Sequence, residues 1–414
     1  MHQDSRARRL LRPPRVPLVA VLLACIAACD AQPSTGPAPR GAATLSSPVL
    51  EPGAPLPGLT LEQRALFERG RGLFQTEFTP ETGLGPLFNN NACSQCHEDP
   101  VVGGIGEEVE RHATAFRATA FRAPTCDDLG AHGGPVIQDS VTPALHAALG
   151  IDREPVPAAA TDTAVRTTAS LLGFGLLEAV PDAEILALAD QADRNGDGIS
   201  GRPNRTADGR VGRFGRKGQV ATLREFTAGA FVNEMGITSP TEPREQTIDG
   251  APLPAGVDPT PDPELTQDAV DATTAFIRLL APPAPLPRTF VEERGRVTFV
   301  LIGCAGCHVP ALVTGFNRVP ALNLKIVRAY TDLLLHDMGP GLADICLGQA
   351  RRAEFRTEPL MGLRFKTTFL HDGRAPTIAA AIRLHAGEAA RARNRFLALS
   401  WLERSALVRF LQGL

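Results

Sequence analysis

Two copies of the pattern Cys-x-x-Cys-His constrain this chain more than any other feature of its sequence. One copy occupies residues 93–97 and the other occupies residues 304–308. Two cysteines at this spacing reach the two vinyl groups of one haem, and the histidine that follows is then aimed at the iron. The sequence therefore predicts two covalently attached haems c. The attachment residues would be Cys93, Cys96, Cys304 and Cys307, with His97 and His308 as the proximal iron ligands.

Zinc held by the two Cys-x-x-Cys pairs is the alternative for the same residues. It leaves both histidines unexplained, and it suits an exported chain poorly, because thiols are oxidised outside the cytoplasm. Each copy of the pattern is also preceded by Arg-Gly-Arg, at 69–71 and 294–296. This recurrence indicates a duplicated module in which a helix leads into a haem-binding turn. We therefore favour the haems.

The first 28 residues are typical of a bacterial lipoprotein signal peptide. A basic stretch ends at Arg15, and the apolar run 16–26 is too short to span a bilayer as a helix. The following Ala27-Ala28-Cys29 resembles the end of a lipobox. We expect residues 1–28 to be removed and Cys29 to be lipidated, which places an exported lipoprotein on the periplasmic side of the bacterial envelope. An ordinary signal peptide cleaved nearby is the alternative.

The composition is that of a soluble globular body with a hydrophobic core. The 414 residues are 43% hydrophobic and 21% charged, with a formal net charge of −3. Because no basic stripe is present, nucleic acid is not expected as a partner. In an oxidising compartment Cys126 and Cys346 are free to form a disulfide, and the sequence leaves open whether they lie close enough.

We expect a mainly α fold with two cytochrome c-like haem domains and long loops, because few windows show the period-2 alternation of strands. Residues 29–58, rich in Pro, Gly, Ala and Ser, indicate a flexible tether. A proline-rich break at 281–285 separates an N-terminal haem domain, 59–281, from a C-terminal one, 288–414. Helices are predicted over 163–180, 182–191, 264–280, 289–302 and 377–386, and after capping boxes at Thr60/Gln63 and Ser400/Glu403.

Several segments of the chain resemble those of a known family. They are GRFG at 212–215, NEMGIT at 233–238, TDLLLHDMGPGLAD at 331–344 and FLHDGR at 369–374. On these segments the chain resembles the bacterial dihaem cytochrome c peroxidase superfamily and, within it, the di-haem oxidoreductases. The resemblance implies two cytochrome c-like domains that face each other. One haem would be coordinatively saturated and pass electrons, and the other would open to bind peroxide.

The resemblance also implies iron ligands for the C-terminal haem. In the superfamily the distal ligand lies fourteen residues after the histidine of the His-Asp-Gly motif, and counted from His371 that position is His385. We therefore expect a bis-histidine haem held by His308 and His385. Imidazole in place of thioether stabilises the ferric state and lowers the potential. A methionine is the alternative, with Met361 the best spaced, and His371 is expected to orient the site without binding iron.

For the N-terminal haem, the peroxidases carry a displaceable histidine on a loop shortly after the proximal one. His112, fifteen residues after His97, is the candidate ligand. His132 and His146 compete with it, and an open site is the other interpretation. Glu234 stands where the family motif carries the acid/base of the peroxide pocket. Such a group would move a proton from the proximal to the distal peroxide oxygen.

Two departures from the relatives bear on this chemistry. Arg216 stands where the relatives place a tryptophan between the haems. Phe226 stands where they have a glutamine after the glutamate of the following helix. An aromatic residue that could relay electrons between the haems and a polar pocket residue are therefore both replaced. The haem-attachment residues are unchanged.

Residues 193–199 follow the first seven positions of an EF-hand loop, with the required glycine at Gly198. The oxygen donors would be the side chains of Asp193, Asn195 and Asp197 and the carbonyl of Ile199. The twelfth position is Asn204 instead of the bidentate glutamate. A turn that binds nothing is the alternative. Because the superfamily binds one calcium between its haem domains, we predict a Ca²⁺ site here.

These features together predict a dihaem c-type oxidoreductase. Electrons from a c-type cytochrome or a cupredoxin would enter at the haem on His308. They would be used at the haem on His97 to reduce hydrogen peroxide or a related oxidant. The rival hypothesis is a non-enzymatic electron-transfer lipoprotein with two six-coordinate irons. A third hypothesis is an enzyme that uses a high-valent haem to oxidise an organic or protein substrate.

Overall fold

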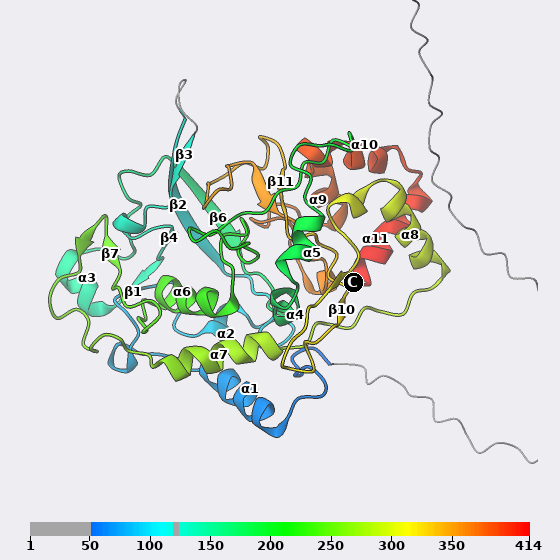
Figure 1. Cartoon of the computed structure of the whole chain (residues 1–414). Coiled ribbons are helices and arrows are strands. Elements are labelled where there is room, and N and C mark those ends of the chain that lie inside the picture. Colours follow the sequence, from blue (N-terminus) through cyan, green and yellow to red (C-terminus); the bar gives the residue numbers. More distant parts are fainter. Residues whose placement is uncertain (1–50, 119–123) are drawn as a thin grey trace, which may run out of the picture. The chain divides into compact units, whose positions relative to one another are not determined.

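The structure is a computed structural model that describes residues 51–118 and 124–414 (Figure 1). These residues belong to one compact unit, Pro48–Leu414. The predicted signal peptide 1–28, the predicted lipidation of Cys29 and most of the tether 29–58 lie outside the described residues. No helix in the described ranges combines the length and the apolar character needed to cross a membrane.

The helices are short, between 4 and 14 residues. The α-helices are α1 (Leu61–Phe74), α2 (Cys93–Cys96), α3 (Pro143–Leu149), α4 (Phe174–Glu178), α5 (Asp182–Ala187), α6 (Leu223–Met235), α7 (Gln267–Leu279), α8 (Phe290–Leu301), α9 (Ile378–Leu384), α10 (Ala390–Ala398) and α11 (Trp401–Gln412). Single 3₁₀ turns occur at Pro80–Thr82, Gly130–His132, Cys304–Gly306, Leu363–Phe365 and Gly387–Ala389.

The strands form several small antiparallel sheets. They are β1 (Leu87–Phe88), β2 (Val109–Arg117), β3 (Thr125–Asp127), β4 (Val136–Ile137), β5 (Ser140–Val141), β6 (Asp162–Thr167), β7 (Thr247–Ile248), β8 (Ala251–Pro252), β9 (Leu312–Val313), β10 (Ile326–Val327), β11 (Leu335–Asp337) and β12 (Glu354–Arg356). The largest sheet has β2 in its middle, paired with β3, β4 and β6. The other pairs are β1 with β5, β7 with β8, β9 with β10 and β11 with β12.

The fold class is mixed rather than mainly α, with 33% helix. Residues 112–115 of β2 are all buried, so this strand shows no alternation of polar and apolar side chains. The helix predicted over 163–180 is wrong in its first part, because residues 162–167 form β6 along the edge of β2. Thr and Val, which favour a pleated strand, make up half of that segment.

The helix starts marked by capping residues are confirmed. The side chains of Thr60 and Ser400 each accept a hydrogen bond from the backbone three residues on, and Gln63 and Glu403 return one. α7 and α8 fall within the predicted ranges, as does α9, which ends at the C-cap residue His385. α5 covers only the first part of its predicted range.

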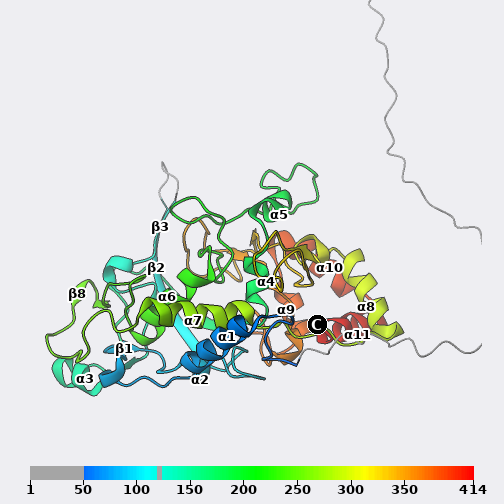
Figure 2. The same cartoon turned by 60° about the horizontal axis from the view of Figure 1, so that its bottom comes forward.

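Two helix pairs repeat the same close crossing. α1 runs alongside α7, and α8 runs alongside α11 (Figures 1 and 2). A Cβ on Gly70 would lie 1.9 Å from the carbonyl oxygen of Ala272, and a Cβ on Gly295 would lie 2.0 Å from that of Ala406. Each glycine is the middle residue of an Arg-Gly-Arg triplet. The repeated triplets therefore mark equivalent crossings, each just ahead of a Cys-x-x-Cys-His pattern.

Three kinds of contact join the N-terminal part of the chain to its C-terminal part. Cys126 of β3 forms a disulfide with Cys346, a pairing that the sequence left open. Arg166 of β6 forms a buried ion pair with Asp344. The main hydrophobic cluster contains residues between Leu56 and Leu334, and so draws from both sides of the predicted break at 281–285. The division into two haem domains stays a prediction.

Candidate cofactor sites

The second Cys-x-x-Cys-His pattern begins directly after α8. The left-handed backbone of Gly303 (φ 99°) ends the helix, and Cys304–Gly306 then form a 3₁₀ turn. The Nδ1 atom of His308 lies 3.0 Å from the carbonyl oxygen of Tyr330. Because a carbonyl can only accept, Nδ1 carries the hydrogen and Nε2 keeps a lone pair.

A cavity of about 380 Å³ is lined by Cys304, Cys307, His308 and His385, a size typical of cofactor pockets. The Nδ1 atom of His385 lies 2.8 Å from the carbonyl oxygen of Ala381, so its Nε2 also keeps a lone pair. Burial lowers the pKa of both histidines, to about 4 for His308. Two neutral imidazoles, each oriented by a backbone carbonyl, are what a metal-binding histidine pair requires.

The methionine alternative fits this geometry less well. The sulfur of Met361 lies against Gly173 and packs with the main hydrophobic cluster, and it does not line the cavity. Met338 does line the cavity, but the fourteen-residue spacing singles out His385. The placement of His385 favours the bis-histidine arrangement, although ligation itself stays a prediction. His371 also lines the cavity, stacked on the ring of Phe355 at 4.3 Å.

A buried cation in the cavity wall was missed by the sequence reasoning. His336 is 3% exposed, with Nε2 2.8 Å from Asp332 and Nδ1 2.7 Å from Glu388. Although burial opposes the charge, the hydrogen bonds that His336 makes to Asp332 and to its other neighbours raise the pKa of His336 to about 12. The imidazolium therefore stays charged at neutral pH. The only signal was the four-residue spacing of Asp332 and His336 within 331–344.

The predicted calcium loop lies against the same cavity, with Asp197 and Ile199 on its wall. Its polar atoms are hydrogen-bonded to one another: Asn195 Nδ2 donates to Asp197 at 3.0 Å, and Gly198 N donates to Asp193 at 3.1 Å. Such contacts are those of an Asx-rich turn. Calcium binding by this loop stays a prediction.

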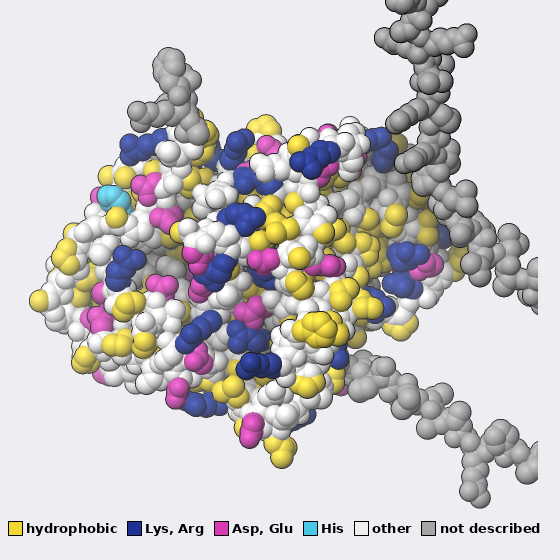
Figure 3. Space-filling model, viewed as in Figure 1, with side chains coloured by type: hydrophobic (Ala, Val, Ile, Leu, Met, Phe, Trp, Pro, Cys, Tyr) yellow, Lys and Arg dark blue, Asp and Glu magenta, His cyan; other side chains and the backbone are white. Residues whose placement is uncertain are grey.

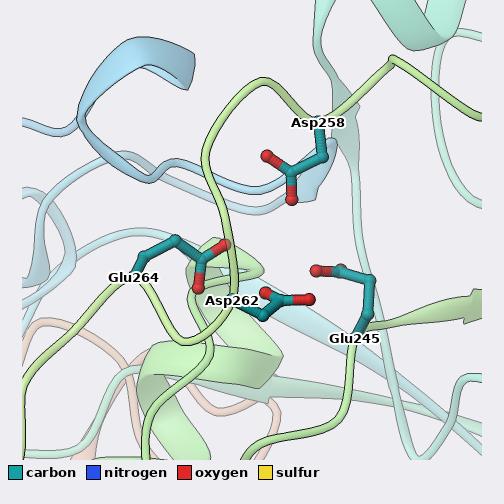
Figure 4. Close-up of side chains that lie close together, drawn as sticks. All are labelled: Glu245, Asp258, Asp262 and Glu264. Carbon is teal, nitrogen blue, oxygen red and sulfur yellow. The ribbon is translucent and has the colours of Figure 1, made fainter.

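Another group of carboxylates comes together elsewhere, from the segment 245–264. In the described part of the chain, Glu245, Asp258, Asp262 and Glu264 place ligand atoms within 4.8 Å of one another (Figure 4). Burial is the main cause that raises the pKa of Glu245 to about 8 and also raises the pKa values of Asp258 and Glu264. Their irregular spacing made the group invisible in the sequence.

The first Cys-x-x-Cys-His pattern forms the single helical turn α2. The Nδ1 atom of His97 lies 3.1 Å from the carbonyl oxygen of Gly104, so its ring is oriented like that of His308. Asn90 donates to the sulfur of Cys96 at 3.4 Å. The ring of Phe74 lies 6.0 Å from that of His97, centre to centre.

Glu234 lies beside this first pattern, in the last turn of α6. Asn89 Nδ2 donates to its carboxylate at 2.7 Å, and the carboxyl also shares a hydrogen bond with Glu110 of β2. Burial, and then the charge of Glu110, raises the pKa of Glu234 well above its usual range. After burial, its charge also contributes to the raised pKa values of Cys93 and Cys96, about 12 and 11.

The structure therefore brings the predicted acid to the predicted attachment cysteines. It adds Asn89 and Glu110, which no motif had marked.

His112 lies next to this carboxyl pair. It is 8% exposed, its Nε2 is 2.9 Å from Glu110, and its Nδ1 is buried with no hydrogen-bond partner among the described residues. The side chains of His132 and His146 are 39% and 56% exposed. Of the three histidines considered, only His112 is both buried and in contact with the Glu110–Glu234 pair. Its role as an iron ligand stays a prediction.

Residues 160–414 match the family model described as "Di-haem oxidoreductase, putative peroxidase". The chain belongs to this family. Membership in a di-haem family implies two haems. The residues present fit one at the second site, where free cysteines and two oriented imidazoles share a cavity.

Three solved structures resemble this di-haem oxidoreductase over most of its length. Hydrazine synthase of Kuenenia stuttgartiensis is 13% identical with a TM-score of 0.36, and the match covers 93% of this chain and 100% of that one. A MauG-like protein associated with microbial copper homeostasis is 15% identical with a TM-score of 0.40, and the match covers 87% of this chain and 92% of that one. The diheme peroxidase BthA of Burkholderia thailandensis is 16% identical with a TM-score of 0.40, and the match covers 84% of this chain and 86% of that one. No curated protein matches the chain.

The two departures noted in the sequence occupy different surroundings in this di-haem oxidoreductase. Arg216 lines the second cavity, where its Nη1 lies 2.7 Å from Glu358 and its Nη2 donates to the carbonyl oxygen of Thr167 at 2.8 Å. Phe226 packs against the main hydrophobic cluster, with its ring 6.3 Å from that of Phe214. Arg216 is therefore part of a site, whereas Phe226 contributes to the core.

Proposed function

We propose that this di-haem oxidoreductase reduces hydrogen peroxide, or a related oxidant, at the first Cys-x-x-Cys-His pattern with electrons that enter at the second. The observation that carries the proposal is the carboxyl pair Glu234–Glu110 beside that first pattern. A carboxyl whose pKa is raised well above its usual range holds its proton more tightly than an ordinary carboxyl, and O–O cleavage needs a positioned proton donor. The reaction takes up two electrons and two protons, breaks the O–O bond and releases two molecules of water.

Glu234 would move the proton between the two oxygens of peroxide. The hydrogen bond from Asn89 fixes its carboxyl group beside Cys93 and Cys96. Burial and then the neighbouring charge of Glu110 raise the pKa of Glu234 and so favour its protonated form. When bound, haem would supply an iron that takes peroxide as a ligand and passes electrons to it.

The second site fits electron entry rather than peroxide binding. His308 and His385 both line the same cavity and each keeps a lone pair on Nε2, so both would be able to hold the iron of a haem bound there and would leave peroxide no place on it. The electrons would come one at a time from a c-type cytochrome or a cupredoxin. A Ca²⁺ ion bound by residues 193–199 would stabilise this loop, which forms part of the cavity wall. A chelator that leaves the haem spectra and the melting temperature unmoved would contradict that part of the proposal.

The covalent attachment and the cellular location are parts of the same proposal. In the described part of the chain, the four motif cysteines are free while Cys126 and Cys346 are paired. A structural disulfide supports an oxidising compartment, which agrees with export as a lipoprotein anchored through Cys29. The pyridine haemochrome spectrum would report the attachment, and mass spectrometry of the N-terminal peptide would report the lipid.

A non-enzymatic electron-transfer role is the second candidate. The buried Nδ1 of His112, unpartnered among the described residues, favours it, because a second histidine on the first iron would close that site. Optical and EPR spectra of the half-reduced holoprotein, with and without peroxide, separate the two functions. A high-spin iron that changes on peroxide addition supports the enzyme. Two irons that stay low-spin and ignore peroxide would overturn it.

A further inference from the structure

Three basic side chains and one carboxylate gather on one part of the wall of the second cavity. They are Arg216, Arg356, Lys366 and Glu358. The group comes from two segments distant in the sequence, so it forms only in the folded chain. Within it, positive charge exceeds negative charge by two.

The carboxylate is already occupied by the two arginines. Glu358 lies 2.7 Å from Nη1 of Arg216 and 3.0 Å from Nη2 of Arg356. Although burial opposes its ionisation, the neighbouring cations lower the pKa of Glu358 to about 2. The other carboxylates on the cavity wall are also engaged, since Asp197 bonds within its own loop and Glu388 bonds His336. None of them is left to neutralise a further cation.

Lys366 is that further cation. Its ammonium group makes no hydrogen bond or ion pair with any side chain in the described ranges, although it faces the cavity. Burial, and then the charge of Arg216, lowers the pKa of Lys366 to about 8. A partly buried ammonium group without a partner is costly unless an anion joins it. The geometry therefore calls for an anionic ligand inside this cavity.

We propose that Lys366 and Arg216 bind the two carboxylates of the haem carried at Cys304 and Cys307. A haem brings two propionate groups, and the cluster has two positive charges in excess. The inference rests on the proposed attachment at the second pattern and names the residues that neutralise the group there. It also gives Arg216 a purpose different from that of the tryptophan it replaces, because a guanidinium binds carboxylates in fixed geometry.

The test uses the substitution of Lys366 by Gln in the purified holoprotein, with Lys325→Gln as the matched control. The side chain of Lys325, the residue just before β10, is exposed, and the chain has only these two lysines besides buried Lys217. The readout is the midpoint potential of each haem, measured by spectroelectrochemistry. Loss of a positive charge beside the propionates should favour the ferric form about tenfold, close to 59 mV for a one-electron couple.

Two further variants, Lys366→Arg and Glu358→Gln, complete the test. Lys366→Arg should restore the potential, and Glu358→Gln should move it in the opposite direction, because it removes a negative charge. A purely structural role of Lys366 would not produce shifts of opposite sign. If Lys366→Gln and Lys325→Gln give the same potential as the wild type, the propionate site is wrong. If Lys366→Gln fails to fold, Glu358→Gln still decides the matter by the direction of its shift.

Failure of the proposed function would look different. A haemochrome measurement of fewer than two haems per wild-type chain would remove the attachment on which both ideas rest. Two haems without peroxide reduction would overturn the catalytic proposal alone. The shift of potential on Lys366→Gln would then still test the propionate site.

Discussion

The carboxyl groups of Glu234 and Glu110 share a hydrogen bond, one from the last turn of α6 and the other from the middle of the sheet. Two carboxyl groups this close cannot both ionise easily, so one keeps its proton. Here burial and the charge of Glu110 raise the pKa of Glu234, and Glu110, in contact with His112, ionises first. The proton shared by the pair is therefore favoured on Glu234.

Replacing Glu234 with Gln should reduce the rate of peroxide reduction by about 10²–10⁴-fold, the usual contribution of a positioned acid/base. The amide can still accept the hydrogen bond from Asn89, so the fold and the haem content should be unchanged. Steady-state turnover with a reduced c-type cytochrome is the measurement. Glu77→Gln, at an exposed position, is the control. Equal rates for the two variants would remove Glu234 from the chemistry.

Replacing His385 with Ala should convert one haem from low spin to high spin, because one of two imidazole ligands is lost. EPR of the oxidised protein reports the change directly. His146→Ala is the matched control, since that side chain is 56% exposed. An unchanged low-spin signal in His385→Ala would mean that His385 is not the sixth ligand and would favour a methionine instead.

Glu154 should make the folded chain less stable as the pH rises. Its side chain is 2% exposed, and burial raises its pKa to about 8. Because the folded-state pKa lies above the unfolded value, this residue's contribution is fully present below about pH 4.5 and is lost as the pH rises toward 8. Glu154→Gln should abolish that loss, a gain on the order of a few kcal/mol at pH 8. Melting temperatures at pH 5 and pH 8 would show it, and equal pH slopes in variant and wild type would contradict it.

Removing the disulfide should destabilise the chain by about 2–4 kcal/mol, because Cys126 and Cys346 are 220 residues apart and their link restricts the unfolded state. The test is the melting temperature of Cys126→Ala combined with Cys346→Ala, measured beside the wild type with and without a reductant. The reductant should lower the melting temperature of the wild type and leave the double variant unmoved. A reductant effect of equal size on both proteins would mean that the reductant acts on a group other than this disulfide.

Gly70→Ala should cost at least about 1–3 kcal/mol, because the new methyl group would lie 1.9 Å from the carbonyl oxygen of Ala272. Gly72→Ala in the same helix is the control: nothing lies within 4 Å of its Cβ position. That change should stabilise the chain by up to about 1 kcal/mol, since alanine favours a helix. Thermal unfolding separates the two, and a similar loss for both would mean that helix propensity, not the crossing, decides.

The sequence predicted features that depend on fixed local spacing. The two Cys-x-x-Cys-His patterns and the capping boxes at Thr60 and Ser400 each set geometry within a few residues. The position of Glu234 beside Cys93 was implied by family resemblance, and the structure does place them together. Each of these conclusions needed either a short motif or a known relative.

The features that were missed depend on contacts between distant segments. Glu110 and Glu234, which lie in contact, are 124 positions apart in the sequence, and His336 and Glu388 are 52 positions apart. The strand β2 escaped prediction because it is covered on both faces and so has no alternating pattern. No spacing rule within one segment reports any of these pairings.

The bond between Cys126 and Cys346 also gives the chain a topology. Residues 126–346 form a closed ring that contains Glu234 and the second Cys-x-x-Cys-His pattern, whereas the first pattern lies on the open arm before it. A protease that cuts once inside the ring leaves both patterns in a single covalent molecule. A single cut between residues 98 and 125 releases the first pattern as a separate fragment. The site of attachment of each haem can thus be assigned from one non-reducing gel stained for haem.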